Sequence, residues 1–211
     1  METIYAPITA SGKAAVAAVR VSGAKAHESL RSLITGAMPE SRHTSLRKLV
    51  DPVSRETIDH AMVILFSGAE SFTGEDSVEY HLHGGAAITQ ALLSYLSRQD
   101  GHRMAEAGEF TRRAFENNKI DLTEAEAIAD LAAAQTQAQK DLALDQLGGA
   151  LSRLYDGWRE RLTRALAYLE ADIDFPDEDL PDGVAAQVRP ILKDLRGEIA
   201  AHLNDNRRGE R

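Results

Sequence analysis

Residues 1–118 alternate between short apolar runs and stretches rich in Gly, Pro and polar residues. The segment 77–83 has the clearest pattern, because its apolar and polar residues alternate with the two-residue period of a strand. Residues 61–66 are apolar throughout, which is typical of a strand buried on both faces. The patterns predict strands at 15–21, 46–50, 61–66, 77–83 and around 103–104, and helices at 24–34, 86–98 and 108–117. Strands that alternate with helices indicate an α/β or α+β sheet domain.

Residues 119–211 follow a helical period almost throughout. Thr123 with Glu126 three positions later fits a capping box that opens the first helix. Further along, apolar residues at spacings of three and four predict one long amphipathic helix, in which Gly148-Gly149 marks a kink or a break. These apolar residues are Leu147, Leu151, Leu154, Trp158, Leu162, Leu166, Leu169 and Ile173.

An acidic connector with two prolines, 170–182, separates this helix from a last helix that Pro190 starts or bends. The expected inward positions of the last helix are Val184, Val188, Ile191, Leu195, Ile199 and Leu203. Three helices cannot each bury an apolar stripe without partners. We therefore expect a bundle whose missing helices come from a second chain or from further sequence. The hydrophobic pattern changes near Asn118 from short strand-like runs to a helical period. This change predicts an α+β domain over 1–118 and an all-α partial helical bundle over 119–211.

Composition narrows the range of functions. The chain has 24 Lys+Arg against 33 Asp+Glu, a net charge of −9, which argues against a protein that binds nucleic acid over its whole surface. It contains no Cys, which excludes disulfides, zinc–thiolate sites and a cysteine nucleophile. The apolar runs are far shorter than the ~18 residues of a membrane span, and the N-terminus lacks a secretory signal pattern. We therefore expect a cytoplasmic protein that does not bind membranes.

Candidate chemistry begins on two predicted strands. Arg20 lies within an apolar strand, so it needs a carboxylate, phosphate or ligand partner unless it faces solvent on a half-exposed strand, which is the more frequent case. Glu79, His81 and His83 share one strand face. An H-x-H pair can bind a metal, but without a third ligand a polar sheet face is the preferred interpretation. Glu79 alone could accept paired hydrogen bonds from an amidine-like ring edge, such as that of a pterin.

Two further features have simple structural explanations. Gly84-Gly85 leads into a helix, where free N–H groups can bind phosphate or carboxylate, although tight turns use glycine equally often. Lys119 alone is typical of a solvated linker lysine. The pair Gly12-Lys13 lacks the first glycine and the hydroxyl residue of a P-loop, so this chain cannot bind a nucleotide in that way.

Short motifs in a fixed order cover nearly the whole chain. They are IYAPIT at 4–9, VRVSG at 19–23, SFTGEDSVE at 71–79, HGG at 83–85, GEFTRRAF at 108–115, NKIDL at 118–122, AEAIAD at 125–130 and IDFP at 173–176. As a set these motifs resemble one family, the tRNA-modification GTPases called MnmE or TrmE. The resemblance implies a tetrahydrofolate-binding, aminomethyltransferase-like first domain that also forms a homodimer, followed by the first part of the family's helical domain.

The resemblance also implies a site and a reaction. Arg20, Glu79 and Lys119 fall where the family contacts 5-formyltetrahydrofolate or 5,10-methylenetetrahydrofolate. Glu79 suits the pterin edge, and Arg20 and Lys119 suit the glutamate tail, or the holding of Glu79. The family works with a flavoprotein, MnmG, to add a (carboxymethyl)aminomethyl group at C5 of the wobble uridine of certain tRNAs. GTP hydrolysis with K⁺ and Mg²⁺ drives its domain movement. The resemblance places no catalytic residue and no metal site in this chain.

Some residues depart from the family pattern. Ala14-Ala15 replaces a glycine-rich turn, and Leu82 stands where a small residue is usual beside the folate pocket. The sequence contains no GTPase motif, so we expect a part of the family protein that binds folate and dimerises without hydrolysing GTP. Two alternatives stay open: a stand-alone folate-dependent one-carbon transferase, and a non-catalytic dimerisation scaffold.

Overall fold

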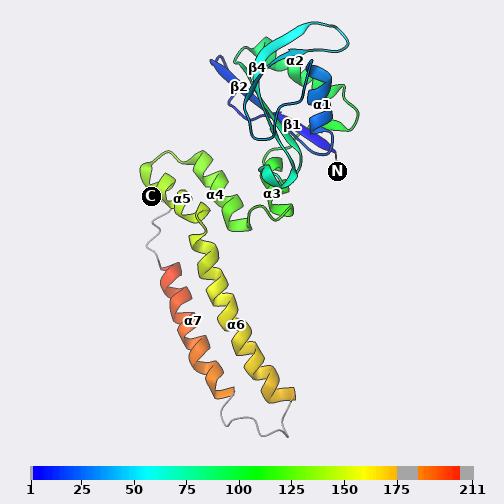
Figure 1. Ribbon diagram of the computed structural model, residues 1–211. Coiled ribbons are helices and arrows are strands. Elements are labelled where there is room, and N and C mark those ends of the chain that lie inside the picture. The colour runs from blue at the N-terminus through cyan, green and yellow to red at the C-terminus, as the bar shows by residue number, and fades with distance from the viewer. Residues whose placement is uncertain (1, 175–184, 205–211) are drawn as a thin grey trace. The chain divides into compact units, whose positions relative to one another are not determined.

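A computed structural model describes residues 2–174 and 185–204 of the chain (Figure 1). The chain divides into two compact units, Met1–Ile120 and Asp121–Arg211. The first unit is a mixed sheet with helices, and the described part of the second consists of helices. This arrangement confirms the predicted fold class, an α+β domain followed by an all-α segment.

A six-stranded sheet, in the order β3-β4-β5-β2-β1-β6, organises the first unit. Its strands are β1 Thr3–Pro7, β2 Val16–Ser22, β3 Ser45–Val50, β4 Thr57–Phe66, β5 Ser77–His83 and β6 His102–Met104. All neighbouring strands pair antiparallel except β1 and β6, which run parallel. The central strands β2 and β5 are therefore neighbours although more than fifty residues of chain separate them.

One face of the sheet holds the hydrophobic core. The helices α1, Ala26–Leu33, and α2, Ala86–Ser97, pack there against fully buried residues such as Val19 and Tyr80. Strand β4 corrects the prediction of a strand buried on both faces: Ala61, Val63 and Leu65 are buried, whereas Met62 is 40% exposed. A continuous apolar run does not specify how many faces are covered, and here helices α1 and α2 cover only one.

The opposite face is covered at one end. Helix α3, Glu109–Glu116, and the segment 67–76, which contains the short 3₁₀ helix η1, Gly68–Glu70, contact it there. Ser22, at the end of β2, hydrogen-bonds Thr73 at 2.7 Å, and both residues are buried. Farther along the same face, apolar residues of the outer strands remain exposed.

The second unit begins with helices α4, Leu122–Ala133, and α5, Gln137–Leu147. The predicted capping box is wrong by two positions. Asp121 is the N-cap of α4: its side chain accepts a hydrogen bond from the backbone N–H of Glu124, and the Glu124 carboxylate accepts one from the backbone N–H of Asp121. The long helix is also divided: α5 ends at Leu147, and α6, Ala150–Asp174, begins after Gly148-Gly149. The glycine pair is thus a break, because Gly149 has a φ of +75°.

Helices α6 and α7, Val188–Leu203, lie side by side (Figure 1). Pro190 lies in the first turn of α7, where its missing N–H costs no helical hydrogen bond. Leu203 is 77% exposed, so its predicted inward position is wrong: it is the last residue of α7, and the described residues leave its side chain uncovered. Other large apolar side chains of the pair are also exposed, namely Leu162, Leu166, Leu169, Ile173 and Leu192.

The connector predicted at 170–182 is helical as far as Asp174, and the rest of it, with Val184, lies outside the described residues. In the described part of the chain, no helix combines the length and apolar character needed to cross a membrane.

Candidate functional site

Arg20 and Glu79 form an ion pair at the centre of the sheet. They are directly opposite each other in the β2–β5 register, on the face away from the hydrophobic core. Arg20 Nε and Nη2 donate to the same carboxylate oxygen, Glu79 Oε1, at 2.9 and 2.7 Å. The side chains are 20% and 16% exposed, so the pair is largely shielded but still open to a ligand. Arg20 thus has a carboxylate partner and is not a solvated strand residue.

This geometry leaves one oxygen of the Glu79 carboxylate and several N–H groups of the Arg20 guanidinium without a hydrogen bond between them. Among the described residues, Glu79 Oε2 accepts no hydrogen bond, and His81 Nε2 lies 3.5 Å from it. His81 Nε2 is itself buried without a hydrogen-bond partner in the described part of the chain. Of the five guanidinium N–H groups, only two are used by Glu79, so the pair offers an acceptor and several donors side by side.

A hollow of about 530 Å³ lies on the uncovered sheet face beside neighbours of the pair, although neither Arg20 nor Glu79 lines it. Ile64, the β4 neighbour of Glu79, and His81 contribute to it. The remaining lining is mostly apolar and comes from Ala15, Val16, Thr44, Leu46, His60, Met62, Leu82 and His83. An apolar hollow beside a few polar groups is the usual form of a small-molecule site.

Phe72 and Phe110 are two residues of the site to which sequence reasoning assigned no role. Their ring centroids lie 5.2 and 5.4 Å from the Cζ atom of Arg20, which is cation–π distance. Phe72 comes from segment 67–76 and Phe110 from α3, and Phe72 is 38% exposed. Both belong to quoted family motifs, but only the structure brings them to Arg20.

Lys119 makes its contacts with other residues than Arg20 and Glu79. Its Nζ donates to the backbone carbonyl of Ala69 at 2.6 Å, and its stem packs beside Gly74, which has a φ of +78°. Asn117 Nδ2 donates to the carbonyl of Thr73 at 2.7 Å. Lys119 therefore holds the segment that carries Phe72, and no contact recorded among the described residues joins it to Arg20 or Glu79.

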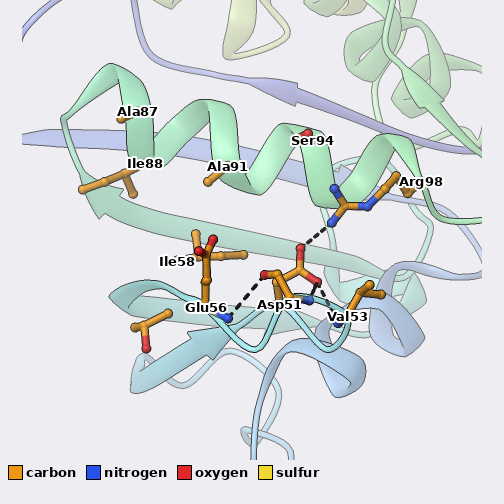
Figure 2. A pocket seen from close by; sticks show the side chains of 11 residues that line it. Asp51, Val53, Glu56, Ile58, Ala87, Ile88, Ala91, Ser94 and Arg98 are labelled. Atoms are coloured by element: carbon orange, nitrogen blue, oxygen red, sulfur yellow. Dashed lines mark hydrogen bonds and ion pairs between the residues drawn. The ribbon is translucent and has the colours of Figure 1, made fainter.

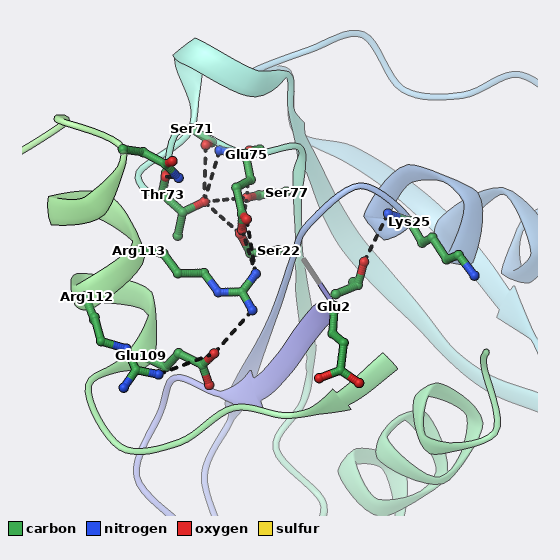
Figure 3. A network of polar contacts seen from close by, with 12 residues as sticks. Glu2, Ser22, Lys25, Ser71, Thr73, Glu75, Ser77, Glu109, Arg112 and Arg113 are labelled. Carbon is green, nitrogen blue, oxygen red and sulfur yellow. Dashed lines mark hydrogen bonds and ion pairs between the residues drawn. The ribbon is translucent and has the colours of Figure 1, made fainter. Parts of the chain in front are cut away.

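Helix α3 is fastened by a buried carboxylate (Figure 3). Glu109, with a side chain only 2% exposed, accepts hydrogen bonds from Arg103 Nη1 and Nη2 at 2.8 and 2.6 Å. It also accepts from the backbone N–H of Glu106 and from Arg113. The Arg103 hydrogen bonds, assisted by these contacts and opposed by burial, lower the pKa of Glu109 to about 2.

The other candidates have structural roles in the described residues. His83 Nδ1 contacts Asp59 Oδ1 at 2.8 Å, and the described residues hold no cluster of three or more metal-binding side chains. A Cβ at Gly84 would lie 2.1 Å from the carbonyl oxygen of Ala14, so glycine is required there by the close approach of two backbones. Leu82 is 1% exposed and belongs to the hydrophobic core, although it also borders the hollow of about 530 Å³.

A second hollow, of about 560 Å³, lies between the β3–β4 connection and α2 (Figure 2). Its polar end is the ion pair of Asp51 with Arg98, and Ile58 and Ile88 form part of its apolar wall. Burial alone would raise the pKa of Asp51, but the backbone N–H groups of Val53 and Ser54 and the Arg98 guanidinium lower it. Because Asp51 is fully paired, this hollow offers less unused hydrogen-bonding capacity than the face of Glu79.

Comparison with known proteins gives the same two-part division. The family model described as the GTP-binding protein TrmE N-terminus matches residues 3–119, and that of the MnmE helical domain matches residues 122–211. Proteins named tRNA modification GTPase MnmE from Parvibaculum lavamentivorans, Phenylobacterium zucineum and Rickettsia bellii are 51%, 53% and 50% identical to the chain over 210 residues. These alignments include 100% of this chain but 48%, 46% and 47% of the relatives. The chain therefore spans about half the length of the curated relatives it matches.

Proposed function

The chain belongs to the family of MnmE (TrmE) tRNA modification GTPases, and from this premise we propose that its first unit binds a reduced folate. The ligand is 5-formyltetrahydrofolate or 5,10-methylenetetrahydrofolate, and it supplies a one-carbon unit when bound. The observation that carries the proposal is the half-satisfied pair of Arg20 and Glu79, whose strand neighbours Ile64 and His81 line an apolar hollow. In this proposal the chain binds the one-carbon donor and contributes no catalytic residue.

The donor and acceptor chemistry of the pair suits a pterin. Glu79 Oε2 can accept from the N3–H or 2-amino group of the ring edge, while Oε1 stays with Arg20. The unused N–H groups of Arg20 can donate to a carbonyl or carboxylate oxygen of the same ligand. The apolar hollow along Ile64 and Met62 would bury the ring system, which supports binding by both polarity and shape.

Lys119 supplies a cation for the glutamate tail in this proposal. Its ammonium group now donates to the carbonyl of Ala69, an interaction that a carboxylate would replace with a charge-assisted hydrogen bond. Lys119 is exposed, so its side chain is free to change rotamer when a ligand binds. Its role is thereby separate from that of Arg20, which keeps its carboxylate partner.

The wider activity is proposed from the names of the relatives and from the resemblance. We propose that the protein acts as a homodimer with the flavoprotein MnmG in the cytoplasm, on the wobble uridine of certain tRNAs. GTP, K⁺ and Mg²⁺ are assigned to the GTPase machinery of the family, because this sequence contains no P-loop motif.

Isothermal titration of the chain with 5-formyltetrahydrofolate tests the proposal. Arg20→Ala and Glu79→Gln should each weaken binding about tenfold or more, since each removes a charged hydrogen-bonding group. Arg31→Ala, an exposed position on α1, is the matched control and should leave the dissociation constant unchanged. Absence of binding by the folded parent would refute the folate site and favour a scaffold role. Turnover of methylenetetrahydrofolate by the chain alone would favour a one-carbon transferase.

A further inference from the structure

The orientation of Arg20 depends on two segments that are distant in sequence. Phe72, in segment 67–76, and Phe110, on α3, both place their rings within cation–π distance of its guanidinium. Glu79 fixes the same guanidinium through one oxygen only. Two rings on separate segments can restrain Arg20 together only if those segments are held in a fixed relation.

Arg113 supplies that connection (Figure 3). Its Nη1 donates to Glu75 Oε1 and Oε2 at 3.1 and 3.0 Å, and its Nη2 donates to Glu109 Oε1 at 3.2 Å. Glu75 lies in the segment of Phe72, and Glu109 precedes Phe110. The Arg113 side chain is only 5% exposed, so one guanidinium joins two carboxylates in a shielded setting. Such a bridge needs the planar fork of arginine, which a lysine ammonium cannot reproduce.

The bridge continues to the strand that carries Arg20. Ser22 Oγ donates to Glu75 Oε2 at 2.8 Å, and Ser22 lies two residues after Arg20 on the same face of β2. Arg113 and Glu75 therefore tie α3, segment 67–76 and β2 together immediately beside the candidate site.

We infer that Arg113 is a positioning residue of the ligand site: it holds Phe72 and Phe110 against Arg20 and so fixes the direction of the unused Arg20 N–H groups. The inference rests on the proposed folate function for its ligand, a reduced pterin with a carboxylate tail. Arg113 acts without touching the ligand, because its own N–H groups are directed to Glu75 and Glu109. Loss of the bridge leaves the Phe72 and Phe110 rings unrestrained, and Arg20 becomes mobile. Ligand binding must then order the Arg20 side chain, which lowers the affinity.

Arg113→Gln tests the inference against Arg112→Gln on the same helix. Arg112 is 53% exposed and pairs with Glu106 at 3.2 Å and more loosely with Glu109 at 3.7 Å, but among the described residues it has no contact with Glu75. The first readout needs no ligand: the Nε–Hε NMR signal of Arg20 should exchange with water faster in Arg113→Gln and stay unchanged in Arg112→Gln. The second is titration with 5-formyltetrahydrofolate, in which Arg113→Gln should weaken binding about tenfold and Arg112→Gln less than about twofold. Arg113→Lys should resemble Arg113→Gln, because it keeps the charge and loses the bridge.

Tyr95→Phe distinguishes a loss of positioning from a mere loss of stability. It removes a buried hydrogen bond to the carbonyl of Ser29 within the hydrophobic core. This variant should be less stable yet keep the Arg20 signal and the affinity. If Arg113→Gln does not fold, Phe72→Leu and Phe110→Leu decide the matter, since each should speed Arg20 exchange. An unchanged Arg20 signal in any folded variant of Arg113, or in both ring variants, overturns the inference. A parent that binds no folate refutes the proposed function, while the Arg20 signal still decides the positioning role.

Discussion

Glu109→Gln should destabilise the first unit in a pH-dependent way. Four donors converge on this buried carboxylate, and its pKa lies at about 2 where 4.5 is usual. At about 1.4 kcal/mol for each tenfold change in proton affinity, the difference sets an upper limit of about 3 kcal/mol. Because Arg103 is 36% exposed, solvent screening lowers this value, and we expect a loss of roughly 1–3 kcal/mol at pH 7.

The sign of the pH effect follows from the lowered pKa. The stabilisation is complete above the unfolded value of 4.5 and is lost as the pH falls toward about 2. The gap between parent and Glu109→Gln should therefore shrink to less than about half by pH 3.

Urea unfolding at pH 7 and pH 3, followed through the amide NMR signals of β2 and β5, measures this gap for the first unit alone. Trp158, on α6, reports on the second unit by fluorescence and should be unaffected. Glu116→Gln is the control, since Glu116 is exposed on α3 and makes no recorded ion pair with the described residues. An equal gap at both pH values, or an equal loss in the control, would refute the assigned role of Glu109.

Three further substitutions test local geometry. Gly74→Ala should destabilise the first unit by about 1–3 kcal/mol in urea unfolding followed by NMR, because its φ is +78° and a Cβ would lie 3.0 Å from that of Asn117. Gly157→Ala, with open space around it inside α6, should stabilise the second unit by about 0.5–1 kcal/mol, measured by Trp158 fluorescence in urea. Asp121→Ala should cost about 1 kcal/mol in the same fluorescence assay, because it removes the N-cap of α4.

The alternation of polar and apolar residues predicted part of the candidate site. It placed Glu79 on the opposite face of β5 from Val78 and Tyr80, and the burial of those two residues agrees. The family resemblance offered the holding of Glu79 as one of two roles for Arg20, but the residue pattern alone could not pair them, because the two lie 59 residues apart and meet only through the β2–β5 register. The contact of the Phe72 ring with Arg20 could not be predicted either, because the sequence pattern around a loop residue does not indicate which residue it contacts.

Local patterns failed where one signal fits two structures. The apolar run of β4 suits a strand covered on one face or on both, and only the position of the helices decides between them. Near the start of α4, Asp121 with Glu124 and Thr123 with Glu126 both match a capping box. Asp121 is the N-cap, and Thr123 lies within the helix and donates to the Asp121 carboxylate at 2.8 Å. Such choices depend on tertiary contacts that a window of sequence does not contain.

The parallel pairing of β1 with β6 has a consequence for synthesis on the ribosome. Thr3 pairs with His102, and its N–H donates to the carbonyl of Gly101. The outer edge of β1 therefore stays uncovered until about a hundred further residues have been synthesised. Strand β1 can pair earlier with β2, but β6 has only three residues and adds last. Contacts of such high sequence separation slow folding, and an uncovered strand edge in the nascent chain favours association with other chains. A chaperone that protects this edge until residue 104 has emerged would therefore act while the sheet is still incomplete.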